Sequence, residues 1–352
     1  MPTQSSGRTT RSSAAPPVND AGLASGNRAA SSAKSTDTVA TNSARSSPSF
    51  TAPEPGLRRI TRSGGTFWAW VLLVPSLALV SVVIIYPLLT GVSLSLHTVI
   101  LTRPDLGRPF VWFENFGRML RDPVIPTAVW NTVVYVVVGV LSQLVLGLFA
   151  ALLLNRRSKR IWIARTVVML PWFLPPIAAA YMFAFMIDPR YGVLTKLAAF
   201  AGIDIGGQGV LANPNLALWG ALLVELWKSY PFFALFLLAA LQGIPEELAE
   251  AASLDGASRF AYFRHIVWPL LRPVVIVSTL LEGIRLANSP VMLLLLTNGG
   301  PGNSTQVLSL YAYQQAYQRF DFGYASAISV ALLVVVIGFA SVYIRVNSSK
   351  ER

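Results

Sequence analysis

Apolar positions are grouped in long blocks along most of this 352-residue chain, and short polar stretches separate them. From Phe67 onward the apolar runs reach the roughly 20 helical residues that a bilayer core requires. Six such runs lie at 67–90, 129–154, 163–187, 216–241, 271–296 and 325–343. Tyr86-Pro87 marks the expected end of the first run. The pattern predicts an all-α, polytopic membrane protein with six transmembrane helices in the lipid bilayer.

Residues 1–66 differ from the rest, because they are rich in Ser, Ala, Thr, Arg, Gly and Pro. Such a segment buries too little apolar surface to offset its ordering entropy. It also lacks the apolar stretch of a secretory signal peptide. We therefore expect a disordered cytoplasmic N-terminal tail at 1–66, a transmembrane domain at 67–343 and a short cytoplasmic C-terminus at 344–352.

Lys and Arg are distributed unevenly between the connecting segments. The tail, the segments 155–165 and 242–272 and the C-terminus hold 19 of them, whereas 97–128, 188–215 and 297–324 hold seven. Basic residues concentrate on the cytoplasmic side of membrane proteins. The count therefore predicts that both termini are cytoplasmic.

The composition supports a membrane protein: 53% of the residues are apolar and 12% are charged, whereas soluble domains carry roughly 25% charged residues. The chain has no Cys, which excludes disulfides, thiolate nucleophiles and Cys-ligated zinc. His97 and His265 are expected on opposite sides of the membrane, so we expect no metal site. The net charge of +12 is scattered, which gives no basic face for nucleic acid. No phosphate-binding loop motif for ATP is present.

Several charged and polar residues lie inside the predicted spans. Glu225 and Lys228 are three residues apart, as are Glu282 and Arg285, so each pair shares a helix face on which the charges partly neutralise each other. One interpretation is that these pairs are packing contacts. The other is that the fifth span lines a polar substrate path with Glu282, Arg285, Asn288 and Ser289.

The cytoplasmic segment 243–269 carries the most specific pattern. Pro245 suits the first turn of a helix, and Asp255-Gly256 suits its end. A second helix is expected from Ala257 toward Trp268, ending at Pro269. Apolar residues at helical spacing line it: Phe260, Phe263 and Ile266. Periodicity alone fits an ordinary amphipathic connector as well as a protruding helix–turn–helix.

The residues themselves resemble the coupling motif of ABC-importer permeases. Glu250-Ala251-Ala252, Gly256, Ile266 and Pro269 fall on every spacing of that motif, and Trp268 replaces its usual Leu. Over 67–343 the chain resembles the carbohydrate-uptake branch, and in particular the subunit type of the larger maltose permease. The segments that carry this likeness are 165–171, 188–192, 225–228, 296–301 and 323–327.

The resemblance implies the type I importer permease fold and a non-catalytic subunit in a bacterial plasma (inner) membrane. It implies a heterodimer with a second permease, two ATPase subunits that bind ATP and Mg, and an extracytoplasmic solute-binding protein that delivers a sugar. The protruding helix would seat in an ATPase cleft. The residues expected to contribute to that coupling are Glu250, Ala251, Ala252, Asp255, Gly256, Ala257, Ile266 and Pro269.

The segment 285–290 departs from the family, which often has aromatic and Asp residues there. No substrate ligand can therefore be carried over by matching. Arg285 favours an anionic sugar or phosphoester, unless Glu282 neutralises it. An alternative function is a stand-alone secondary transporter driven by an ion gradient, which would favour inverted repeats; no clear repeat is seen. A third reading is a membrane-bound enzyme, but the chain has only two His, no Cys and no nucleophile motif to support it.

Overall fold

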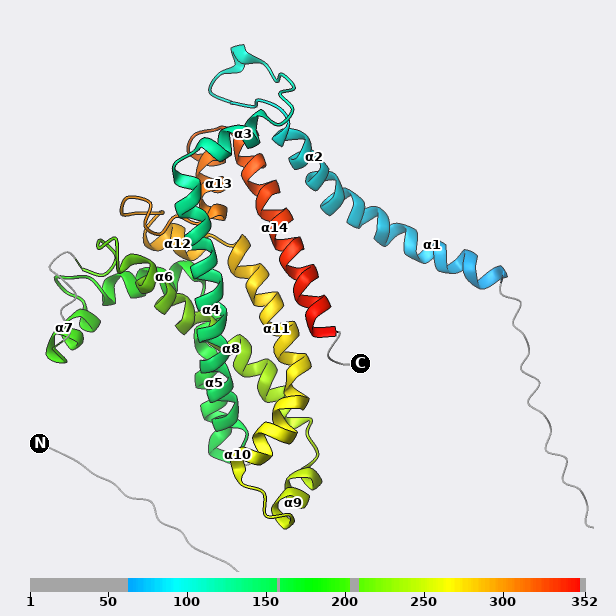
Figure 1. The fold of residues 1–352 in the computed structure, drawn as a ribbon, viewed down its shortest axis with the longest axis vertical. Helices are drawn as coiled ribbons and strands as arrows, with labels where there is room; N and C mark the ends of the chain where they lie inside the picture. Colours follow the sequence, from blue (N-terminus) through cyan, green and yellow to red (C-terminus); the bar gives the residue numbers. More distant parts are fainter. Residues whose placement is uncertain (1–62, 157–158, 203–208, 349–352) are drawn as a thin grey trace, which may run out of the picture. The chain divides into compact units, whose positions relative to one another are not determined.

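The computed structural model describes residues 63–156, 159–202 and 209–348, and its regular elements are helices (Figure 1). Within these residues, strand-like pairing is limited to two isolated bridges, His97 with Phe110 and Ile100 with Asp321. The all-α prediction is confirmed. Positions 1–62 of the expected tail and 349–352 of the C-terminus lie outside the described residues. Tail positions 63–66 belong to the first helix, α1 (Ser63–Val80).

Two helices continue past prolines at which the sequence predicted an end. A π-helical turn, η1 (Ser81–Ile85), joins α1 to α2 (Tyr86–Ser95), which contains Pro87. A second, η3 (Phe263–Val267), joins α10 (Arg259–Tyr262) to α11 (Trp268–Asn288), which contains Pro269. A proline cannot donate to the carbonyl one turn earlier, and a π turn accommodates the altered hydrogen bonding. The predicted ends at Pro87 and Pro269 are therefore wrong.

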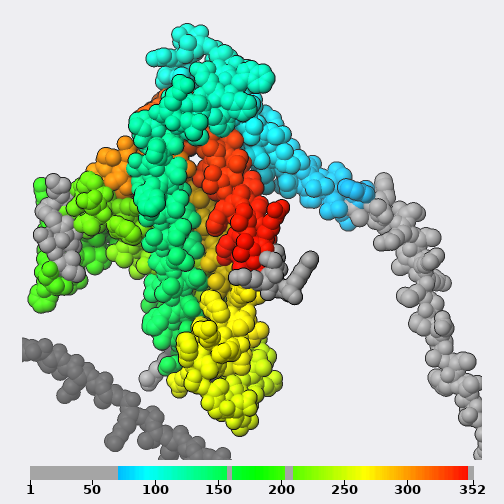
Figure 2. Space-filling view, viewed as in Figure 1, coloured from blue at the N-terminus to red at the C-terminus, as the bar shows by residue number. Residues whose placement is uncertain are grey.

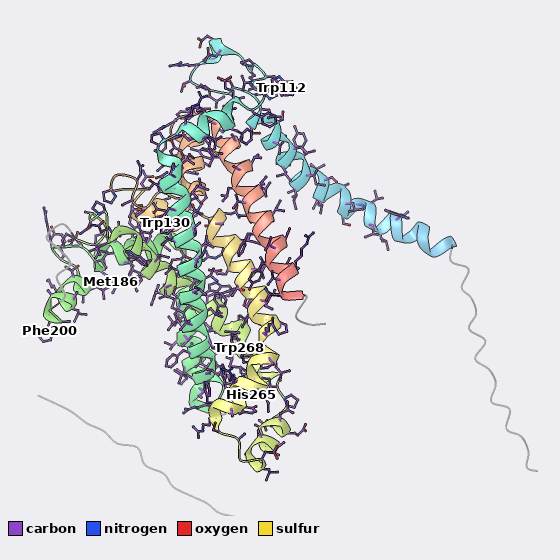
Figure 3. The ribbon with its side chains drawn as sticks, in the orientation of Figure 1. Trp112, Trp130, Met186, Phe200, His265 and Trp268 are labelled. Atoms are coloured by element: carbon purple, nitrogen blue, oxygen red, sulfur yellow. The ribbon has the colours of Figure 1, made fainter. Side chains whose placement is uncertain are left out.

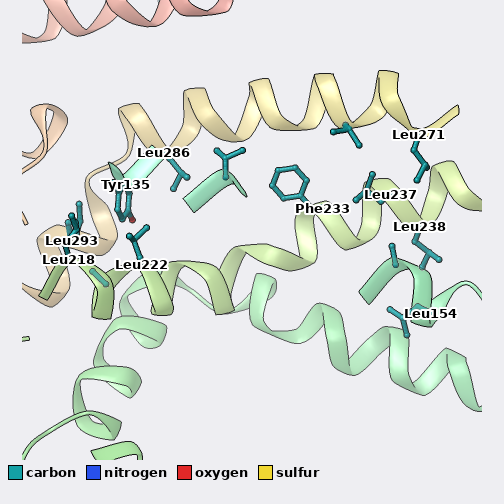
Figure 4. Packing of buried hydrophobic residues seen from close by; sticks show 14 of the residues in the cluster. Tyr135, Leu154, Leu218, Leu222, Phe233, Leu237, Leu238, Leu271, Leu286 and Leu293 are labelled. Atoms are coloured by element: carbon teal, nitrogen blue, oxygen red, sulfur yellow. The ribbon is translucent and has the colours of Figure 1, made fainter. Parts of the chain in front are cut away.

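Three long helices form the main core: α4 (Val124–Leu154), α8 (Ala217–Gln242) and α11. Figure 4 shows the buried side chains between them, which include Tyr135, Leu222, Phe233, Leu271 and Leu286. The α4 and α8 backbones approach closely at Gly147. A Cβ there would overlap Phe233 Cβ and lie 3.0 Å from the backbone nitrogen of Ala234. Small residues at such crossings permit close helix packing in membranes.

The third predicted span is sharply bent. It consists of α5 (Lys159–Phe173) and α6 (Pro176–Met186), whose axes differ by 95°. Pro175 is extended, with ψ 139°, and two consecutive prolines remove two backbone donors from the break. Within the described part of the chain, the six predicted spans correspond to five apolar helices long enough to cross a membrane plus this bent pair. The short helix α7 (Val193–Phe200) follows.

The fifth span lies closer to the N-terminus than predicted. The continuous helix runs from Arg259 to Asn288, rather than from 271 to 296. It ends because Ser289 is extended and precedes Pro290. The remaining expected residues form a separate helix, α12 (Val291–Leu296), which packs against α6.

The last span, α14 (Phe322–Ser348), packs against α2, against α3 (Glu114–Arg121) and against α13 (Leu308–Tyr317). The short 3-10 helix η2 (Pro104–Leu106) lies in the loop between α2 and α3, which also carries Trp112 (Figure 3). In the span Trp70–Ser95, no residue of the most apolar window is buried. That surface is therefore available to lipid or to another subunit.

Candidate functional site

The segment between α8 and α11 forms a helix that reverses through a tight turn. Helix α9 (Glu246–Leu254) ends at Asp255, and Gly256 has a φ of +72°. The backbone nitrogen of Ala257 donates to Ala252 O at 2.9 Å, and that of Gly256 donates to Ser253 O at 3.2 Å. This pair of hydrogen bonds defines a Schellman motif, which glycine permits because it has no Cβ. The turn lies where Asp255-Gly256 predicted it.

The chain enters the next helix through a side-chain cap. Ser258 is extended, and its Oγ accepts a hydrogen bond from the backbone nitrogen of Ala261 at 3.2 Å. Helix α10 therefore begins at Arg259, two residues after the predicted start. It continues without interruption through η3, which contains His265, into α11, which begins at Trp268 (Figure 3). The turn is thus joined directly to the membrane-spanning part of the chain.

Two large apolar side chains flank the turn without being buried. Leu254 is 88% exposed and Phe260 is 70% exposed. Figure 2 shows the surface of this segment (yellow) projecting beyond that of α4. Exposed apolar side chains on either side of a turn are candidates for contact with another protein. Leu254 was not singled out in the sequence, although an apolar residue directly before an Asp-Gly helix end could have indicated it.

The predicted coupling residues are mostly at the surface of this element. Glu250, Ala251, Asp255, Gly256, Ala257 and Pro269 are exposed, Ile266 is half-buried and Ala252 is buried. Ala252 packs toward the protein, so its small side chain serves the internal packing of the loop. Glu250 and Ala251 remain open to a partner.

A charged cluster inside the bundle joins α8 to α11. Arg285 donates from Nε to Glu282 Oε2 at 2.8 Å and from Nη2 to Glu282 Oε1 at 2.6 Å. Its Nη2 also forms an ion pair with Glu225. Both glutamates are nearly fully buried, whereas the side chain of Arg285 is 42% exposed. The guanidinium therefore presents one edge outward while two buried carboxylates hold its other side.

Two hydroxyls complete the hydrogen bonding of this cluster. Ser229 Oγ donates to Glu225 Oε1 at 2.8 Å, and Tyr135 OH donates to Glu225 Oε2 at 3.3 Å. Neither residue was predicted from the sequence, although Ser229 lies one helical turn after Glu225 on the same face. Tyr135 comes from α4, and no sequence spacing indicated it. A buried carboxylate is stabilised only when its oxygens are paired in this way.

Only one of the two ion pairs predicted from helical spacing is present in the structure. The Glu282–Arg285 ion pair is confirmed. Glu225 pairs with Arg285, and Lys228 makes no ion pair within the described residues. Asn288 is exposed at the end of α11, where its Nδ2 donates to Ile284 O at 2.8 Å. Ser289 is half-buried just after the helix. Glu282, Arg285 and Asn288 thus follow one another along α11.

Asn131 supports the segment 297–307 from α4. Its Nδ2 lies within 3.3 Å of Asn303 O and within 3.0 Å of both Ser304 O and Gln306 O. The hydroxyl of Thr132 accepts from the backbone nitrogen of Leu308 at 2.9 Å. These contacts anchor the start of α13, so Asn131 has a structural role here.

A carboxylate outside the spans ties α3, α13 and α14 together. Asp122 Oδ2 accepts hydrogen bonds from Tyr311 OH at 2.6 Å and Tyr324 OH at 2.7 Å. Burial by itself would raise the pKa of Asp122. These two hydrogen bonds and a third from the Val124 backbone nitrogen stabilise the carboxylate more strongly, so the pKa lies below its usual value. Burial and the same carboxylate raise the pKa of Tyr311 to about 12. No sequence pattern indicated this cluster, because its members are far apart along the chain.

A second group of contacts, formed by Arg118, lies beside the Asp122 cluster. Arg118 Nη1 pairs with Asp321 Oδ2 at 2.6 Å, and its guanidinium carbon lies 4.2 Å from the centre of the Tyr324 ring. Such a cation–π contact adds to the attraction of the ion pair. Together the two clusters hold α3 against the start of α14.

Proteins similar to this chain are transport permeases. The "Sulfoquinovosyl glycerol transport system permease protein SmoG" of Agrobacterium fabrum is 34% identical over 290 residues, which cover 82% of this chain and 92% of that protein. The "Trehalose/maltose transport system permease protein MalF" of Thermococcus litoralis is 36% identical over 278 residues, which cover 79% and 92%.

A solved structure shares the fold. A chain from a bacterial ABC transporter involved in the import of the acidic polysaccharide alginate aligns with a TM-score of 0.67 and 21% identity. The alignment covers 80% of this chain and 96% of that one. The architecture is therefore that of a type I ABC importer permease. Residues 143–350 match the family described as "Binding-protein-dependent transport system inner membrane component". With this match and these relatives, the chain belongs to the family of inner-membrane permease components of binding-protein-dependent ABC importers.

Proposed function

We propose that this permease imports a sugar by transmitting ATP-driven movements of partner ATPases through α9 to the membrane helices. The observation that carries the proposal is the exposed turn around Gly256, with Leu254 and Phe260 projecting from it. A fixed turn with apolar side chains fits a cleft on another protein. The roles expected of Glu250 to Ala257, Ile266 and Pro269 belong to this proposal.

The partners would be a second permease, two ATPase subunits and an extracytoplasmic binding protein. The apolar and unburied span Trp70–Ser95 offers surface for a second permease or for lipid. ATP and Mg would be bound by the ATPases, so this chain is proposed to be non-catalytic and without a cofactor of its own. The excess of Lys and Arg in alternate loops supports cytoplasmic termini in a bacterial inner membrane.

The charged cluster favours an uncharged sugar. Arg285 and Lys228 are balanced by Glu225 and Glu282, and Arg285 is held by both carboxylates. The outward edge of Arg285 can therefore donate hydrogen bonds to hydroxyls without adding net positive charge. Trehalose and maltose, named for the archaeal relative, fit this chemistry. We place Glu282, Arg285, Asn288 and Ser289 along the substrate path, with the two glutamates positioning Arg285.

Copurification tests the assembly. The complex is extracted from the native membrane in mild detergent and analysed by mass spectrometry. We expect an ATPase and a second six-span permease to accompany this chain. Recovery of this chain alone, still transporting sugar in vesicles without ATP, would instead establish a secondary transporter.

A matched pair of variants tests the role of α9. Leu254→Glu places a charge on a side chain that is 88% exposed at the turn, and we expect it to release the ATPase. Leu120→Glu, on α3, alters a leucine that is 82% exposed elsewhere and should keep the ATPase bound. Equal recovery of the ATPase with both variants would contradict the assignment of α9.

A further inference from the structure

A small groove lies where the end of α11 meets α13 and α14. Its volume is about 270 Å³, and its lining includes Asn288, Ser309, Tyr313, Tyr317 and Ser326. No charged side chain contributes to the lining. Small-molecule sites span roughly 300–1,000 Å³, so this groove has room for one small ring rather than for an oligosaccharide.

One hydroxyl in the groove lacks a partner. Ser309 is 9% exposed, and its Oγ is buried without a hydrogen bond within the described part of the chain. Buried polar atoms are nearly always paired, and leaving one unpaired is costly. Besides the two tyrosine hydroxyls, the lining has three other polar side chains: Asn288 and Ser329 bond to their own helices, and Ser326 is half-buried. A rotation of the Ser309 side chain toward the groove would therefore let its hydroxyl bond to a ligand.

Aromatic rings form a second wall. The centroids of Tyr313 and Tyr317 lie 4.9 Å apart with an interplanar angle of 36°, and both side chains are exposed. Phe322 meets Tyr317 at 6.1 Å and 73°. Aromatic side chains provide an apolar face with a polar hydroxyl at its edge. The apolar C–H face of a pyranose stacks on such a ring, while its hydroxyls bond to neighbouring amides and hydroxyls.

We propose that this groove is a subsite for one uncharged pyranose ring, bound by stacking on Tyr317 and by hydrogen bonds to Ser309 and Asn288. This inference rests on the proposed function, because it assumes that the substrate is a sugar. Asn288 lies three residues after Arg285, on the same face of α11. A ring released from the groove would therefore meet the outward edge of Arg285 one helical turn further along the path.

Cysteine labelling tests the subsite directly, because the native chain contains no Cys. A Ser326→Cys variant is assembled with its partner subunits, and the rate at which a maleimide labels this chain is measured against maltose or trehalose concentration. We expect sugar to slow the labelling. Asn215→Cys, on an exposed residue outside the groove, should be labelled at a rate independent of sugar.

Second substitutions in the Ser326→Cys background measure the individual contacts. Tyr317→Ala should raise the half-protecting sugar concentration about tenfold, and Ser309→Ala should raise it roughly three- to tenfold. Tyr181→Ala, an exposed tyrosine on α6, is the control for removing a ring elsewhere.

The outcomes separate the two proposals. If the wild-type complex imports these sugars but they do not protect Ser326→Cys, or neither substitution shifts the protection, the subsite is overturned and the importer stands. Labelling blocked with or without sugar would mean that another chain covers the groove, which also overturns the subsite. If the complex neither imports nor is protected by either sugar, the subsite is overturned for these sugars, and the copurification experiment decides whether the importer stands.

Discussion

Replacing Gly256 by valine tests whether the shape of the α9 turn couples ATP hydrolysis to transport. Gly256 has a φ of +72°, and a Cβ there would meet no atom within 4 Å. The penalty is therefore conformational rather than steric. It amounts to about 1–2 kcal/mol for an ordinary residue in the left-handed region and up to about 3 kcal/mol for strained positions. A β-branched residue falls at the upper end of this range.

A penalty of about 1.4–2.8 kcal/mol lowers the equilibrium constant between the native turn and its other conformations 10- to 100-fold. The assay is ATP hydrolysis by the reconstituted complex, stimulated by the binding protein and sugar. We expect Gly256→Val to lower the stimulated rate by that factor while the chain still inserts into the membrane. Gly256→Asn is the matched control, because asparagine tolerates the left-handed conformation. Full stimulation with Gly256→Val would refute the reasoning.

Three further outcomes follow from the contacts. Arg285→Leu leaves Glu225 and Glu282 buried without their cation and should destabilise the protein by about 3–5 kcal/mol; thermal unfolding in detergent measures this, and an unchanged midpoint would contradict it. Gly147→Leu should prevent the close approach of α4 to α8, which would reduce the amount of folded protein seen by size-exclusion chromatography, whereas Gly338→Leu, where a Cβ meets nothing within 4 Å, should not. The lowered pKa of Asp122 means that its stabilising effect is complete above its ordinary value of 3.8 and is lost as pH falls through the lower folded-state pKa. The difference in thermal stability between the native protein and Asp122→Asn should therefore shrink below about pH 4, and a constant difference would argue against it.

Local rules made part of this structure predictable. The turn at Gly256 follows from the conformational freedom of glycine, and the Glu282–Arg285 pair follows from helical spacing. The apolar runs located the spans, because a bilayer requires a minimum length of helix. Each of these features depends on residues that are neighbours in the sequence.

Other features depend on contacts between distant segments or on local backbone adjustments. The ion pair between Glu225 and Arg285 joins residues that are 60 positions apart, so spacing within one helix could suggest only Lys228 as the partner of Glu225. The π turns before Pro87 and Pro269 allowed helices to continue where a proline normally ends them. The double proline after Leu174 instead produced a sharp bend within a predicted span.

The uninterrupted helix from Arg259 to Asn288 has a mechanical consequence. It contains 30 residues, so at 1.5 Å per residue it is about 45 Å long. Tilting such a rod by about 5° about the end next to the Gly256 turn moves its far end by about 4 Å. That displacement exceeds the length of the hydrogen bonds between Arg285 and α8. Either α8 moves together with α11, or these hydrogen bonds break. The ion pair between Arg285 and Glu225 thus decides whether a small rotation at the Gly256 turn moves α11 alone or α11 together with α8.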